Sequence, residues 1–222
     1  APLRPYCNNI HPGRFRNYLD FANGTLGDWG VHWLDQLLWW SEEQWPKKVF
    51  STGGRPVAGE AVLNDREQTT DAPDHQVATY EFENFTATWE HRRFAGSGAD
   101  KSRYGCYFYG SNGTFHMGWR DGWTFYPNKK SQAEVHEDPK FDNERDGHNV
   151  PPLWRDFMDA IVEGRKPVAD VEIGHLSSNL SMLGMLSMKA GRSIQWDGAK
   201  EQIINDSEAN ALLRRDYRGD WE

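Results

Sequence analysis

Residues 24–40 read GTLGDWGVHWLDQLLWW, and this stretch decides how the first part of the chain folds. Its apolar positions recur with the spacing of an amphipathic helix, which we predict to end near Ser41. In a helix Asp28 and His32 lie one turn apart, and Asp35 follows three residues after His32. All three side chains therefore share one face.

Two carboxylates that flank an imidazole form a proton-transfer arrangement. They determine which ring nitrogen of His32 carries the proton, and they favour the imidazolium form. A histidine placed in this way can act as a general acid or base. The alternative interpretation is a helix with a solvated polar face, in which Asp28 is an ordinary acid of the first turn. Spacing alone leaves both interpretations open.

Composition narrows the class of protein. The chain has 222 residues and an acidic balance, 25 Lys and Arg against 33 Asp and Glu, which argues against a nucleic-acid partner. No apolar run is long enough for a membrane span, and there is no signal-peptide pattern. We expect a soluble protein of the cytoplasm or periplasm. Its 11 tryptophans fill a core, or face a sugar ring or a partner subunit. The two cysteines, Cys7 and Cys106, match no metal-ligand spacing.

Strand signals dominate the middle of the chain. Residues 76–82 and 85–93 alternate between apolar and polar positions and predict a hairpin with one buried face. Ala78, Tyr80 and Phe82 lie on that face. A meander with tight Asn-Gly and Asp-Gly turns follows. Its strands are predicted at residues 104–109, 114–120 and 123–126, with further short strands at 49–52 and, at a sheet edge, 193–196.

Helix signals dominate the last third of the chain. Pro151-Pro152 opens a helix that stops at Gly164, and Asp170 caps a longer helix that stops at Gly191. A short last helix starts at Asp206-Ser207. We therefore predict a single α+β domain over residues 1–222, with a broad, largely antiparallel open sheet and helices packed on one face.

Three further side chains are candidate substrate contacts. Arg16, in the irregular segment before the first helix, can bind a substrate oxygen or simply cover the surface. His148 precedes a helix and can face the same cleft, although an ordinary loop histidine explains it as well. Trp29 points away from the Asp28 and His32 face, yet it can line the mouth of a cleft; packing is the alternative.

The stretch at residues 24–35 resembles the central motif of the Gfo/Idh/MocA family of NAD(P)-dependent sugar and polyol oxidoreductases. Residues 109–114 resemble a turn of that family's second domain, and residues 164–167 resemble the segment before its long helix. Residues 196–221 resemble the C-terminal sequence of a subgroup of these enzymes. The resemblance covers nearly the whole chain, but only the family's C-terminal half, which has a dihydrodipicolinate-reductase-like fold.

The resemblance implies a role for each residue of the helix. His32 is the general acid/base, Asp28 holds a substrate hydroxyl or tunes the histidine, and Asp35 supports the substrate site. It also implies an NAD or NADP cofactor, a sugar or polyol substrate, and a homo-oligomer formed through the sheet face.

The sequence departs from the family in its cofactor elements. It has no strand followed by G-x-G-x-x-G and a helix, and no Glu-Lys-Pro motif. We expect the substrate and oligomerisation half of a longer enzyme, which alone does not transfer hydride. The alternative is a free-standing carbohydrate-binding or scaffold domain. A metal-dependent hydrolase that uses Asp28, His32 and His148 is a third reading without motif support, so we predict no metal site.

Overall fold

The computed structural model describes Arg4, residues 6–64, 66–95, 104–140 and 150–215, and Gly219. The chain divides into two compact units. The larger unit comprises residues 1–95 and 172–222, and the smaller unit comprises residues 96–171. The predicted single domain over residues 1–222 spans both units.

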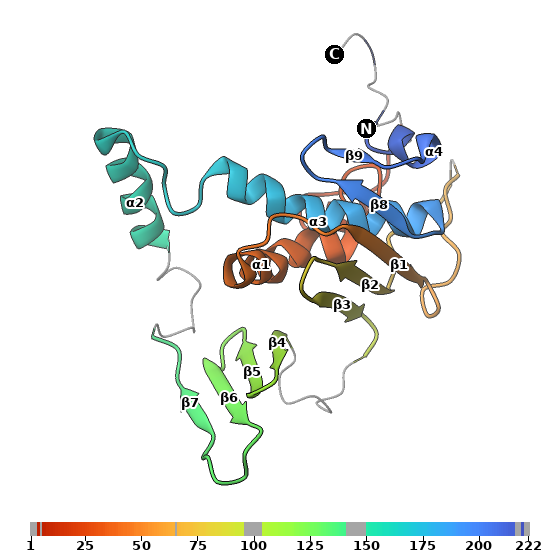
Figure 1. The fold of residues 1–222 in the computed structure, drawn as a ribbon. Coiled ribbons are helices and arrows are strands. Elements are labelled where there is room, and N and C mark those ends of the chain that lie inside the picture. Colours follow the sequence, from red (N-terminus) through yellow and green to blue (C-terminus); the bar gives the residue numbers. More distant parts are fainter. Residues whose placement is uncertain are drawn as a thin grey trace. The chain divides into compact units, whose positions relative to one another are not determined.

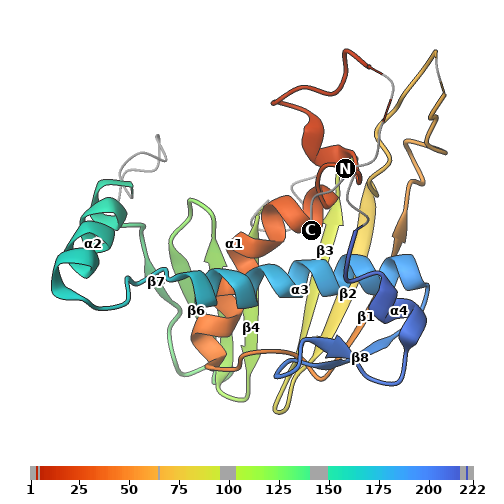
Figure 2. The ribbon, with the colours of Figure 1, turned by 90° about the horizontal axis from the view of Figure 1, so that it is seen from above.

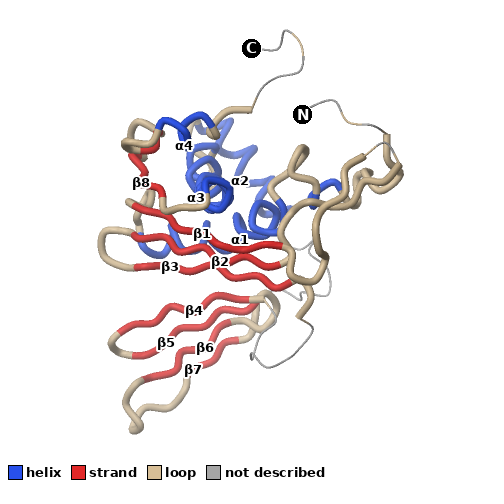
Figure 3. Tube along the Cα trace, turned by 90° about the vertical axis from the view of Figure 1, so that its right-hand side faces the viewer, coloured by secondary structure: helices blue, strands red, loops and turns tan. Residues whose placement is uncertain are grey.

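The larger unit is built on an antiparallel five-stranded sheet with the order β3-β2-β1-β8-β9. The helices α1 and α3 cover the same face of its strands β1 to β3 (Figures 1 and 3). The elements of this unit are η1 (Phe15–Asn17), α1 (Gly24–Ser41), β1 (Lys48–Gly54), β2 (His75–Glu81), β3 (Thr86–Arg92), α3 (Val171–Ala190), β8 (Ile194–Asp197), β9 (Gln202–Ile203) and α4 (Ser207–Ala211).

The hairpin of β2 and β3 has the faces that the alternation predicts. Tyr80 pairs with Ala87, and Ala78 pairs with Trp89. Tyr80, Ala78 and Phe82 are buried, while Ala87 and Trp89 pack against the same core from the neighbouring strand. The period of two along each strand therefore directs these side chains under the helices.

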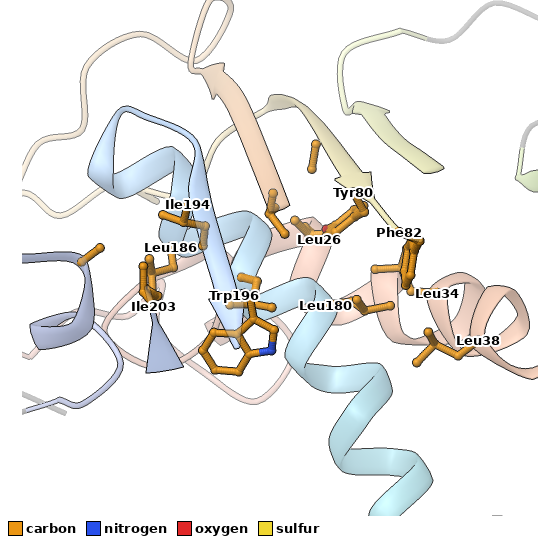
Figure 4. Packing of buried hydrophobic residues seen from close by; sticks show 14 residues of the cluster. Leu26, Leu34, Leu38, Tyr80, Phe82, Leu180, Leu186, Ile194, Trp196 and Ile203 are labelled. Carbon is orange, nitrogen blue, oxygen red and sulfur yellow. The ribbon is translucent and has the colours of Figure 1, made fainter. Parts of the chain in front are cut away.

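Helix α1 presents an apolar stripe to the sheet. Its buried residues Leu26, Gly30, Leu34 and Leu38 are spaced four apart, one turn of helix after another. The helix ends at Ser41, as predicted, because the backbone turns left-handed at the next residue. Figure 4 shows where this stripe meets the rest of the core, and its labelled partners are Tyr80, Phe82, Leu180, Leu186, Ile194, Trp196 and Ile203.

Small residues let α1, α3 and the sheet approach closely. Figure 2 shows α3 crossing α1. A Cβ atom on Gly30 of α1 would lie 2.5 Å from Oγ of Ser181 of α3. A Cβ atom on Gly184 of α3 would lie 2.6 Å from the hydroxyl oxygen of Tyr80. These two glycines fix the position of α1, the helix that carries the candidate catalytic residues.

Arg192 stabilises the start of α4, near the carboxyl end of the larger unit. Arg192 donates two hydrogen bonds of 2.9 Å to the carboxylate of Asp206, which holds the pKa of Asp206 below its usual range. Asp206 in turn caps α4 by accepting from the backbone of Ala209, so the predicted start of this helix is confirmed. The predicted edge position of β8 is wrong, because β9, a two-residue strand with no sequence signal, pairs with its outer side.

The described residues of the smaller unit form an antiparallel sheet with the order β4-β5-β6-β7 and a helix. Its elements are β4 (Gly105–Gly110), β5 (Gly113–Gly118), β6 (Trp123–Pro127), β7 (Val135–Glu137) and α2 (Val150–Glu163). Strand β7 is absent from the sequence prediction. It runs so close to Gly122, where φ is +61°, that a Cβ atom there would lie 1.9 Å from the carbonyl oxygen of Glu137.

The predicted α+β class with antiparallel strands is confirmed. Where we expect one broad sheet, the described strands are hydrogen-bonded in two sheets, of five and four strands. Alternation along a strand predicts its faces, but it holds no information on which strands pair across a long connection. The connection between β3 and β4 includes residues 96–103, which lie outside the described part of the chain.

Candidate functional site

Helix α1 carries the acid and histidine that the sequence singles out. Because α1 is continuous from Gly24 to Ser41, Asp28 and His32 lie one turn apart on it. The buried stripe of α1 faces the sheet, so these two residues lie outside the core. The Asp28 side chain is 36% exposed, and His32 is exposed. Both groups are therefore accessible to a ligand in the described structure.

Arg16 reaches Asp28 from the short helix η1. Its Nε donates to Oδ1 of Asp28 over 2.7 Å, and its guanidinium lies 5.1 Å from the centre of the Phe15 ring. The sequence separation of twelve residues gives no hint of this pair. The arginine partly neutralises the carboxylate beside His32, so Arg16 joins Asp28 and His32 in the proposed proton-transfer device.

Trp29 contacts the histidine. The centre of its ring lies 6.0 Å from that of His32, and the two rings meet edge to face at 68°. Trp29 is partly buried, so its ring supports one side of the imidazole. The structure thus brings together four of the predicted site residues: Arg16, Asp28, Trp29 and His32.

Asp35 of α1 forms a hydrogen bond with a residue of α3. Its Oδ1 accepts a hydrogen bond of 2.5 Å from Oγ of Ser177, a fully buried residue of α3. Ser177 lies 142 residues away in sequence and carries no signal that marks it as a partner. The bond fastens α1 to α3 and so helps to hold the helix that presents His32.

The connector of residues 18–23, which joins η1 to α1, rests on contacts that the sequence analysis missed. Arg4 has a buried guanidinium that lies 3.0 Å from Oδ2 of Asp20 and 3.5 Å from Oδ2 of Asp71. The other oxygen of Asp71 accepts from the backbone of Leu19 over 2.7 Å. Opposite charges in the sequence are the only signal for this cluster.

The remaining candidates lie elsewhere. His148 falls within residues 141–149, outside the described part of the chain. His175 of α3 is exposed and contacts the carboxylate of Glu201 and the amide of Asn179, so it is accounted for as a surface histidine. Cys7 and Cys106 are free thiols, and burial raises the pKa of Cys106 to about 12, which leaves it protonated at neutral pH.

The described residues offer no site for a metal or a dinucleotide. Among them, no group of three His, Cys, Asp or Glu side chains could hold a metal ion. The paired strands of both described sheets run antiparallel, whereas a dinucleotide fold needs a parallel βαβ unit with a glycine-rich turn. None of the described helices has the length and apolar character needed to cross a membrane.

The chain matches one protein family over its whole length. The profile of the Gfo/Idh/MocA oxidoreductase family, described as "Oxidoreductase family, C-terminal alpha/beta domain", matches residues 1–222. The chain belongs to this family. A comparison with curated proteins finds no match for the sequence.

Solved structures share the fold at low sequence identity. An oxidoreductase domain protein from Kribbella flavida is 17% identical with a TM-score of 0.62, over 92% of this chain and 56% of that chain. The aldose-aldose oxidoreductase from Caulobacter crescentus, complexed with glycerol, is 14% identical with a TM-score of 0.61, over 83% and 51%. Levoglucosan dehydrogenase, in complex with NADH and levoglucosan, is 15% identical with a TM-score of 0.62, over 86% and 56%. The chain thus spans about half the length of these relatives.

Proposed function

We propose that this chain is the substrate-binding and oligomerisation half of an NAD(P)-dependent oxidoreductase that acts on a sugar or polyol. The observation that carries the proposal is the exposed His32 one turn from Asp28, whose carboxylate is held by Arg16. Family membership supports the reaction class. The glycerol and levoglucosan complexes of two structural relatives support the class of substrate.

His32 is the proposed proton acceptor. In the oxidation direction its imidazole takes the proton of the substrate hydroxyl, and in the reduction direction it returns that proton to the carbonyl oxygen. Arg16 binds Oδ1 of Asp28, and we assign Oδ2 to a hydroxyl of the substrate. The other N–H groups of the guanidinium can donate to a second hydroxyl, which gives the pair a bidentate geometry suited to a diol.

A nicotinamide supplies hydride acceptance and donation in this proposal. Because the described residues form no dinucleotide site, we propose that residues outside them hold this cofactor, and we assign no step through it to this chain. NAD or NADP is proposed because the structural relatives include complexes with NAD+ and with NADH and a protein whose description names NADPH.

The sheet face is the proposed subunit contact. On β4 the rings of Tyr107 and Tyr109 lie 6.0 Å apart and nearly parallel, and Tyr109 is 80% exposed. Exposed aromatic side chains on a sheet are typical of interfaces between subunits. Light scattering on Tyr109→Lys should show a smaller assembly than the unchanged protein, while Lys129→Ala, at an exposed position after β6, should leave the assembly unchanged.

Replacement of His32 tests the function. In the complete protein, His32→Ala should lower kcat by about 10²- to 10⁴-fold, the usual contribution of general acid–base catalysis. NADH binding, followed by its fluorescence, should be unchanged. His175→Ala is the matched control, because it removes a histidine that contacts Glu201 on another element. Full turnover in His32→Ala would refute the proposed role.

A non-catalytic carbohydrate-binding domain is the second candidate function. The 11 tryptophans of the chain favour it, because their flat rings suit packing against sugars. Calorimetry separates the two: a binding domain binds sugars with the same affinity whether or not NADH is present. Coupled affinities of sugar and NADH in the complete protein would favour the oxidoreductase.

A further inference from the structure

Arg215, near the carboxyl end of the described chain, contacts the start of α1. Its Nη2 donates to Oδ1 of Asn23 over 3.0 Å, and its Nη1 donates to the backbone carbonyl of Asp20 over 3.2 Å. One guanidinium thus joins two points of the connector that are 195 and 192 residues away in sequence. The planar fork of arginine suits such a double contact, because both donors are held at a fixed separation.

The contacted residue Asn23 is the N-cap of α1, directly before the first residue of the helix. Asparagine in this position usually caps its own helix, but the side chain of Asn23 makes no such bond and instead accepts from Arg215. Its backbone carbonyl accepts from Gly27, the residue before Asp28. The next residue, Gly24, is buried with φ of +64° against Ala72, so the chain direction there is tightly set. Movement at Asn23 is therefore transmitted to the first turn of α1.

The other contacts hold the end of η1 and the amino half of the connector. Asn17, the last residue of η1, accepts from Arg93, and Leu19 of the connector donates to Asp71. The carboxylate of Asp20 contacts Arg4. Within the described part of the chain, the hydrogen bond to the side chain of Asn23 comes from Arg215. The connector determines the distance between Arg16 on η1 and Asp28 on α1. The position of its carboxyl half therefore affects whether these two side chains can pair.

We propose that Arg215 is a positioning residue for the site: it holds the start of α1 so that Arg16 stays on Asp28 beside His32. The effect of Arg215 on catalysis rests on the proposed function, whereas its effect on the Arg16–Asp28 pair does not depend on that function. Loss of Arg215 loosens the Arg16 contact, and the carboxylate of Asp28 is then less neutralised. The charge of Asp28 then acts more strongly on the His32 ring one turn away.

Proton NMR of the histidine rings in the complete protein tests this chain of contacts without a substrate. Arg16→Ala should change the chemical shifts of the His32 ring protons at a fixed pH, because the guanidinium that neutralises the carboxylate one turn away is gone. Arg215→Ala should move the same resonances in the same direction by part of that amount. Arg215→Lys keeps the charge but cannot span both oxygens, so its resonances should lie between those of Arg215→Ala and the unchanged protein.

Arg214→Ala is the matched control, because Arg214 is the adjacent exposed arginine. It should leave the His32 resonances in place. His32 resonances that are unchanged in Arg215→Ala, or unchanged in Arg16→Ala, would overturn the inference. In the active enzyme Arg215→Ala should lower kcat/KM by part of the loss seen in Arg16→Ala. If no sugar or polyol is turned over, the proposed function fails, while the NMR result still decides the positioning role.

Discussion

Arg16 and Asp28 form an ion pair, with Nε 2.7 Å from Oδ1, that joins η1 to the first turns of α1. Both side chains are substantially exposed, at 45% and 36%. An exposed pair of this kind stabilises a fold by less than about 1 kcal/mol, because water already solvates both charges. The pair therefore contributes little to stability, and its position one turn from His32 is the reason that we propose a functional role for it.

Arg16→Ala should separate these two effects. We expect the free energy of unfolding to change by less than about 1 kcal/mol, while kcat/KM falls at least about tenfold through loss of one charge-assisted contact. Denaturant unfolding and steady-state kinetics measure the two quantities. Arg14→Ala is the control, because Arg14 is an exposed arginine two residues earlier in the chain. Equal kinetic losses in both variants would show that only the local charge matters.

Asp35 should behave as a structural residue. Asp35→Ala leaves the fully buried hydroxyl of Ser177 without its acceptor, which costs about 1–3 kcal/mol. Asp35→Asn retains an acceptor oxygen and should cost less. The loss in Asp35→Ala should be non-additive with that in Ser177→Ala in a double-mutant cycle, since both remove the same bond. Undiminished stability together with a raised KM would instead assign Asp35 to the substrate.

The residues of α1 show how far the sequence could predict this site. Periodicity predicts the helix, its end at Ser41 and the shared face of Asp28 and His32, because these properties depend on neighbours within a few residues. The partners of that face come from far along the chain: Arg16 across the connector, Ser177 on α3 and Arg215 near the end. Such partners are set by tertiary packing, which local patterns do not encode.

The strands show the same limit. The alternation in β2 and β3 predicts their pairing and buried face, since a tight turn brings them together. It does not predict that β4 begins a second sheet, or that the short strands β7 and β9 exist at all. A strand of two or three residues has too few positions to show a period of two.

The close approach at Gly184 predicts opposite effects for two glycines of α3. Gly184→Ala would place a Cβ atom 2.6 Å from the hydroxyl oxygen of Tyr80 and 2.7 Å from Cδ2 of Leu26, and should destabilise the protein by about 1–3 kcal/mol. Gly174→Ala meets nothing within 4 Å and should stabilise it by up to about 1 kcal/mol through better helix propensity. Thermal unfolding compares the two. Similar effects in both variants would mean that α3 does not pack at Gly184 as described.

His91 makes stability depend on pH. It is 9% exposed, and its Nδ1 accepts from Nε1 of Trp89 over 3.0 Å, which places the ring proton on Nε2, 3.4 Å from the carbonyl of Pro73. Its pKa is lowered from 6.5 to about 4, chiefly by burial; the nearby His75 and Arg93 contribute to this lowering, whereas the Pro73 carbonyl and Asp74 oppose it. The folded protein therefore keeps this ring neutral where the unfolded chain binds a proton.

The sign of the effect follows from the lowered pKa of His91. Above pH 6.5 both states are neutral and the full stability is present. As the pH falls from 6.5 towards 4, only the unfolded state gains a proton, so up to about 3 kcal/mol of stability is lost. Urea unfolding at pH 7, 5.5 and 4.5 should show this fall. His91→Gln keeps an acceptor and a donor without a titrating ring, so it should be less stable at pH 7 but lose less on acidification. His175→Gln, which changes an exposed histidine, is the control and should keep the pH dependence of the unchanged protein. If His91→Gln also kept this pH dependence, the titrating group would be a residue other than His91.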